Sequence, residues 1–197
     1  MFRSQPRSLL FMLILSVLFA LATTSPSRAQ TEEYRTLTQE ILGLNAATSR
    51  LHELTRVAER ISYVESSALL SFQGDWKGEK GNWSDELESP FFYDVFKLQE
   101  RFAPEVIQIG KAVGRDKTIG ESEQNGFRSI ISDVQAMLEE TRSFYDLLHE
   151  GKMDEANSFF RDHTRERYSS IQNASYTLGL TLNDRIKKAG LEMRLLK

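Results

Sequence analysis

Apolar residues recur at heptad spacing along the first long stretch that follows the N-terminal segment. With Leu37 as position a, nine of the eleven a and d positions up to Phe72 are apolar. A seam sustained over this length is typical of long helices that pack against each other. It predicts a first helix over residues 31–72, which needs partners along its length to be stable. The two exceptions, Glu40 and Glu65, place carboxylates in the seam.

Three further amphipathic stretches follow. The second is expected to start at Pro90, directly after the capping residue Ser89, and to kink or break at Pro104. The third covers residues 122–151, and the fourth starts near Met153. No run of alternating β-branched residues indicates a strand. The pattern therefore predicts an all-α fold, an antiparallel up-and-down four-helix bundle with long helices.

The first 29 residues have the order of a secretory signal peptide. Arg3 and Arg7 precede an apolar run over residues 9–22, and small residues surround a cleavage site expected after Ala29. The run is shorter than the roughly 20 residues that span a bilayer comfortably. We therefore expect a signal peptide at 1–29 and one helical domain at 30–197, periplasmic or secreted. The alternative is an uncleaved N-terminal anchor, the one case that places the protein at a membrane.

Charge and cysteine content narrow the classes of partner. The net charge of -3 combines three positive charges in residues 1–29 with a surplus of acidic residues in the rest of the chain. An acidic domain argues against a nucleic-acid partner, because phosphate contacts need clustered Lys and Arg. The absence of cysteine excludes disulfide scaffolds, Cys-ligated zinc and iron–sulfur centres.

Catalytic signatures are missing from the sequence. It has no nucleophile elbow, P-loop, dinucleotide-binding glycine pattern or zinc-protease helix, so we expect no enzyme activity and no cofactor. A di-metal helical bundle needs two Glu-x-x-His pairs, and none occurs. The remaining alternative, a b-type haem or metal-binding bundle, would depend on His163 beside Phe159 and Phe160.

Four residues are candidates for ligand binding. A buried carboxylate is costly unless paired, so Glu65 either faces an arginine of the last helix, lines a polar cavity, or reaches water opposite the connection. Arg50 flanks the seam and either holds an anion at a bundle or dimer interface or forms a surface salt bridge. Trp76 and Trp83 lie in the glycine-rich connection 73–89. They either contact a ligand or partner there or cap the end of the bundle.

The stretch Leu-His-Glu-Gly-Lys-Met-Asp-Glu-Ala at 148–156, followed by a long amphipathic helix, resembles a known context. It is similar to the turn into the last helix of the four-helix-bundle sensor domains of methyl-accepting chemotaxis proteins and related sensor kinases. The resemblance implies a ligand bound near the membrane-distal part of the bundle, often between the subunits of a homodimer, with Arg50 as the matching arginine. Those receptors continue into a second membrane span and a signalling part, so the resemblance implies a detached, sensor-like bundle.

These observations give one leading hypothesis and one alternative. The leading hypothesis is an exported, non-catalytic helical bundle that binds a small ligand or a protein partner in the periplasm. The alternative is a structural or chaperone-like interaction protein that acts through the connection with Trp76 and Trp83 and through exposed apolar surface.

Overall fold

The computed structural model describes the backbone of residues 28–75 and 90–196, and the side chains of residues 29–70 and 97–196. These residues are helical apart from short turns, so the prediction of an all-α fold is confirmed. Among the described helices, none combines the length and the apolar character of a membrane span. The elements are α2 (Arg28–Asp75), α4 (Pro90–Arg115), α5 (Glu121–His149), α6 (Met153–Phe159), the π-helical turn η1 (Phe160–Arg165) and α7 (Glu166–Leu195).

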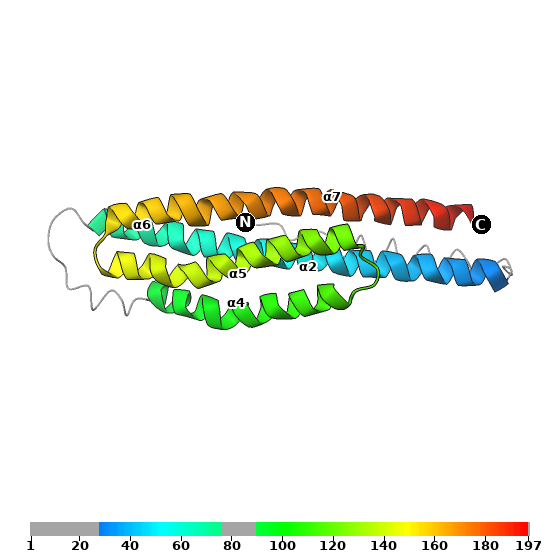
Figure 1. The fold of residues 1–197 in the computed structure, drawn as a ribbon, viewed down its shortest axis with the longest axis horizontal. Coiled ribbons are helices and arrows are strands. Elements are labelled where there is room, and N and C mark those ends of the chain that lie inside the picture. Colours follow the sequence, from blue (N-terminus) through cyan, green and yellow to red (C-terminus); the bar gives the residue numbers. More distant parts are fainter. Residues whose placement is uncertain (1–27, 76–89, 197) are drawn as a thin grey trace, which may run out of the picture.

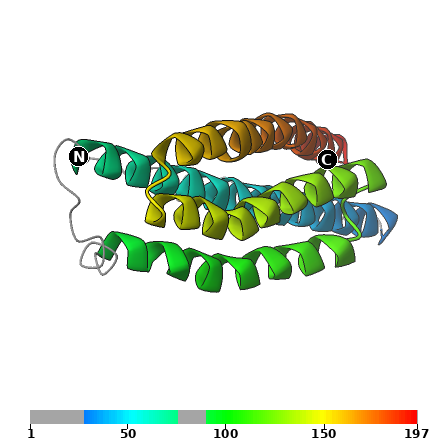
Figure 2. The same cartoon turned by 60° about the vertical axis from the view of Figure 1, so that its left-hand side comes forward.

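The long helices lie side by side along the length of the molecule (Figure 1). The colours of the ribbon show that the chain reverses direction from α2 to α4, from α4 to α5, and from α5 to the stretch formed by α6, η1 and α7. The turned view shows the same lengthwise packing (Figure 2). α2 packs against α7, α5 and α4, and α5 packs against α4 and α7. At one end α2 and α7 extend beyond the turn between α4 and α5 (Figure 1).

The apolar seam of α2 is buried wherever the structure describes it. Its buried members are Leu37, Leu44, Ala47, Leu51, Leu54, Ala58, Ile61 and Ala68. The matching face of α5 contributes Phe127, Ile130, Val134, Met137, Leu138, Phe144 and Leu148. Burial of these side chains supplies the favourable free energy that the isolated 48-residue helix α2 would lack.

The predicted helix boundaries lie within three residues of the observed ones. α2 extends beyond the predicted range at both ends, α4 starts at Pro90 and α6 starts at Met153. Gly151, with φ 73°, ends α5: the backbone N–H of Lys152 donates to the carbonyl of Leu147 at 2.9 Å. This is the bond that closes a helix through a left-handed glycine.

Of the kink or break expected at Pro104, the break is wrong, because α4 continues through this residue to Arg115. A proline inside a helix removes one backbone hydrogen-bond donor. Pro104 is exposed, so water can reach the carbonyl that loses its partner. Phe102 and Val106 on either side of it are buried and hold the helix against the core.

Two features of the last helical stretch were not predicted, its division into three parts and its π-helical turn η1. Eight residues separate the buried side chains of Ala156 and Thr164. In a regular α-helix two turns take about 7.2 residues. A side chain eight residues after Ala156 would therefore lie about 80° further around the helix axis and would turn away from the core. The wider turn at Phe160–Arg165 absorbs this difference and keeps Thr164 inside.

Candidate functional site

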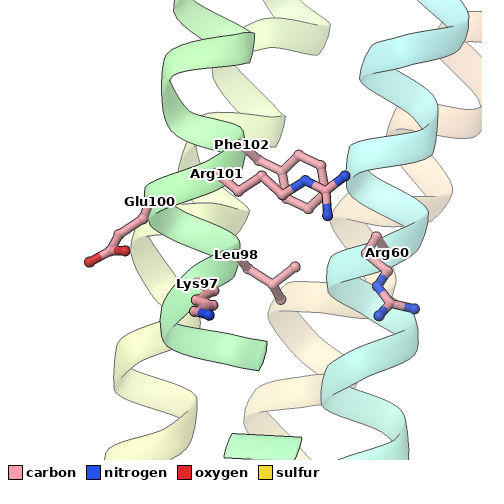
Figure 3. Close-up of a pocket in the computed structure, with 6 residues that line it drawn as sticks. All are labelled: Arg60, Lys97, Leu98, Glu100, Arg101 and Phe102. Carbon is pink, nitrogen blue, oxygen red and sulfur yellow. The ribbon is translucent and has the colours of Figure 1, made fainter. Parts of the chain in front are cut away.

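A hollow of about 340 Å³ lies between α2 and α4. Arg60 of α2 lies on one side, and α4 contributes Lys97, Leu98, Glu100, Arg101 and Phe102. Leu98, Arg101 and Phe102 extend from α4 toward α2, whereas the carboxylate of Glu100 points away (Figure 3). We call this hollow the basic groove.

The basic groove combines positive charge at its rim with apolar carbon at its floor. Arg60, Lys97 and Arg101 are exposed, while Leu98 and Phe102 are buried with only 5% and 4% of their surface accessible. The guanidinium of Arg101 lies 5.3 Å from the ring centre of Phe102, within range of a cation–π interaction. Among the lining residues that the structure describes, three are cationic and one is a carboxylate that points outward, a surplus of positive charge that attracts anions. The volume falls in the range of small-molecule sites.

The residues of the basic groove were missed at the sequence level. Exposed lysine and arginine on an amphipathic helix normally belong to the solvated face. One signal was available: Lys97 and Arg101 are four residues apart, and so are Leu98 and Phe102. Residues at this spacing share a helix face, so α4 carries a basic row directly beside an apolar row. That α2 brings Arg60 opposite these rows follows only from the packing of the two helices.

A second polar cluster lies inside the core, around Glu65 of α2. This residue is 1% exposed, and the hydroxyl of Thr164 in η1 donates to its Oε2 at 2.5 Å. Thr141 of α5 lies within hydrogen-bonding reach of the same carboxyl group. Glu65 therefore does not reach water, and its partner on the fourth helical stretch is a threonine rather than an arginine.

The surroundings of Glu65 oppose its ionisation. Burial raises the pKa of the Glu65 carboxyl from its ordinary 4.5 to about 7, although hydrogen bonding with Thr164 and Thr141 acts in the opposite direction. The charge of Glu140 adds to the rise. Burial also raises the pKa of the Tyr145 phenol, and the negative charge of Glu65 contributes. Near neutral pH the cluster thus contains a carboxyl group balanced between its acid and its carboxylate forms.

The other carboxylate of the seam, Glu40, does meet an arginine of the last helix. The guanidinium of Arg185 in α7 lies 2.6 Å from Glu40 of α2 and 2.8 Å from Glu123 of α5. Glu123 also accepts the backbone N–H of Gly120 at the start of α5. This network ties three helices together near the turn between α4 and α5.

Arg50 forms a salt bridge with another residue of the chain. Its guanidinium donates to Oδ2 of Asp116 at 2.6 Å, in the turn between α4 and α5. Burial tends to raise the pKa of Asp116, but hydrogen bonds from Thr118 and Arg50 outweigh it and bring the pKa below its ordinary value. The structure does not bring Arg50 together with Glu65 in one site, since each has its own set of partners.

Of the remaining predicted residues, the structure describes only His163. Trp76 and Trp83 lie outside the described residues. His163 is exposed, and its ring stacks on Phe159 with the ring centres 4.5 Å apart. Among the described side chains, those of residues 29–70 and 97–196, no group of three or more His, Asp or Glu is arranged to hold a metal ion.

Comparison of the chain with protein-family models, with curated proteins and with solved structures finds no match. The basic groove and the core cluster around Glu65 are therefore the features of the molecule that bear on its function.

Proposed function

We propose that this chain is an exported, non-catalytic protein that binds a small anionic ligand in the periplasm. In this proposal residues 30–197 act as an antiparallel up-and-down four-helix bundle of the sensor-domain kind, and the ligand occupies the basic groove. The observation that carries the proposal is that Arg60, Lys97 and Arg101 line one hollow together with the apolar side chains of Leu98 and Phe102 (Figure 3).

The chemistry of the groove specifies the ligand class. The cations at the rim bind a carboxylate or another compact anion through charge-assisted hydrogen bonds, which are stronger than those between neutral groups. The floor formed by Leu98 and Phe102 offers carbon surface to an aliphatic or aromatic group. An anion that carries a short apolar group meets both requirements, whereas a fully polar anion meets only the first.

Calorimetric titration of the purified protein with hexanoate, benzoate, acetate and inorganic phosphate tests this assignment. Hexanoate and benzoate should bind saturably and more tightly than acetate or phosphate, because only the first two fill the apolar floor. Arg101→Ala and Lys97→Ala should each weaken binding roughly tenfold, the loss expected for one hydrogen bond to a charged group. No saturable signal with any of the four anions at low salt would refute the proposal.

Two further variants test whether ligand binding depends on the basic groove or on an arginine elsewhere on the surface. Arg128→Ala removes an exposed arginine of α5 that donates hydrogen bonds to Asn125 and Gln124 of its own helix, and it should leave affinity unchanged. Arg50→Ala removes the arginine that the sensor-domain resemblance implies. Loss of binding in Arg50→Ala, with normal binding in Arg101→Ala, would move the site from the basic groove to the turn at Asp116.

A further inference from the structure

α7 carries apolar side chains on two opposite faces. Its inner face packs against α2 and α5 and buries Ile171, Leu178, Leu182 and Ala189. Among the described side chains eight large apolar ones are exposed, and four of these belong to α7: Tyr176, Leu180, Leu191 and Leu195, with 70%, 48%, 59% and 86% of their surface accessible. A surface helix normally has polar residues on its solvent side. The exposed apolar side chains of α7 therefore do not serve the core of the bundle.

The four exposed apolar residues of α7 lie in one row with two charged residues. The row advances by four, four, three, four and four residues, and side chains at these intervals are neighbours on one helix face. Its two charged members, Asp184 and Lys187, are 74% and 76% exposed and lie 3.5 Å apart. We call this row the outer row: Tyr176, Leu180, Asp184, Lys187, Leu191 and Leu195.

The outer row has the same spacing when it is read from either end. Its midpoint lies between Asp184 and Lys187, and in each direction a leucine follows after four residues and another large apolar residue after four more. Two copies of α7 that lie antiparallel with their midpoints aligned therefore bring together three kinds of matched pair: Leu180 with Leu191, Tyr176 with Leu195, and Asp184 with Lys187 of the other copy.

The charges of the outer row favour this antiparallel orientation. In a parallel pair with the same residues aligned, Asp184 would lie opposite Asp184 and Lys187 opposite Lys187. Like charges opposite each other disfavour that arrangement. In the antiparallel pair each carboxylate instead lies opposite an ammonium group, twice per pair of helices. The apolar positions permit both orientations, so the two charged residues select one.

We propose that the outer row is the surface on which a second copy of this chain docks, through an antiparallel pair of α7 helices. An interface with two-fold symmetry uses the same patch on both copies, so the patch must be complementary to its own reversed sequence. The outer row meets this condition in its spacing, its apolar positions and its charges. A partner of another sequence would not require this symmetry. The contact extends over about 28 Å of helix.

The docked second copy leaves the basic groove accessible. α7 and α4 lie on opposite sides of the molecule in both views (Figures 1 and 2), and the groove lies between α4 and α2. The groove therefore does not face the second copy. The proposed dimer does not depend on the ligand proposed for the groove, and either proposal can fail without the other.

Sedimentation velocity of the purified protein from about 1 μM to about 1 mM tests for the dimer. The protein should convert from monomer to dimer over this range. Leu191→Glu should weaken the dimer by at least about tenfold, because it places an unpaired charge opposite a leucine twice per dimer. Leu42→Glu is the matched control, since this leucine of α2 is similarly exposed at 56%, and it should dimerise like wild type. Circular dichroism checks that both variants are folded.

Reversal of the central charges tests the register. Asp184→Lys should weaken the dimer, because each Lys187 then faces an introduced lysine of the other copy. Adding Lys187→Asp to this variant should restore the affinity, since the reversed pair is complementary again. A parallel pair would respond to neither change.

Single cysteines report the same register directly, because the chain has none of its own. A mixture of Leu180→Cys and Leu191→Cys proteins should be oxidised to mixed dimers rather than to like pairs. In a like pair of Leu180→Cys proteins the two sulfurs would be about 16 Å apart along the helices. The proposal is overturned if the protein stays monomeric up to about 1 mM, if Leu191→Glu dimerises like wild type, or if like pairs dominate the oxidised mixture.

Discussion

Glu65→Gln should make the protein about 3 kcal/mol more stable at pH 8 and should change its stability little at pH 4. The pKa of Glu65 is about 7 in the folded protein and has its ordinary value of 4.5 when the chain unfolds. The folded state therefore binds the proton more tightly. The stabilising effect of that proton is complete below pH 4.5 and is lost as the pH rises through 7. A glutamine keeps an acceptor for Thr164 and a donor for Thr141 without the charge.

Urea unfolding followed by circular dichroism at pH 4, 6 and 8 measures this effect. The wild-type free energy of unfolding should fall between pH 5 and pH 8 relative to that of Glu65→Gln, and the two curves should meet at pH 4. Glu59→Gln is the matched control and should run parallel to wild type, because Glu59 is exposed. If the free energy of unfolding changed with pH in the same way for wild type and Glu65→Gln, ionisation of Glu65 would not destabilise the folded protein, and the prediction would be wrong.

The helices were predictable because their signals are local. The heptad seam of α2, the Ser89–Pro90 start of α4 and the glycine that ends α5 each depend on neighbouring residues. Whether Pro104 ends its helix could not be predicted locally, because that effect depends on exposure, and exposure is set by tertiary packing. The eight-residue spacing from Ala156 to Thr164 is visible in the sequence. It indicates a π turn only when both residues are known to be buried, and the sequence does not show that.

The site was predictable only in part because its contacts join distant segments. The charged seam residues were recognised as unusual, yet nothing in the sequence showed that Glu40 meets Arg185 or that Glu65 meets Thr164. Helix periodicity identifies the face a residue occupies, not the residue opposite it. The basic groove illustrates the same limit, since its α4 residues share a face that becomes a site only when α2 lies across from it.

Gly43 of α2 lies where the turn between α4 and α5 contacts the helix. A Cβ added at this glycine would lie 2.7 Å from the Cβ of Thr118 and would also overlap the rest of that side chain. The backbone N–H and hydroxyl of Thr118 both bind Oδ1 of Asp116, at 3.0 and 2.6 Å. Asp116 in turn pairs with Arg50 of α2. Thr118 therefore cannot move away without disturbing the contacts that dock this turn on α2.

Gly43→Ala should destabilise the protein by about 2 kcal/mol, because the overpacking cost of about 1–3 kcal/mol exceeds the gain in helix propensity. Gly190→Ala is the matched control in α7. Apart from the backbone of α7 itself and the two neighbouring residues, no atom of the described residues lies within 4 Å of its added Cβ, so it should stabilise by about 0.5–1 kcal/mol. Thermal unfolding of both variants measures the opposite signs. Removing the opposing side chain with Thr118→Gly should make the double variant less destabilised than the sum of the single changes. Equal stabilisation by Gly43→Ala and Gly190→Ala would mean that the turn does not press on α2 at this point.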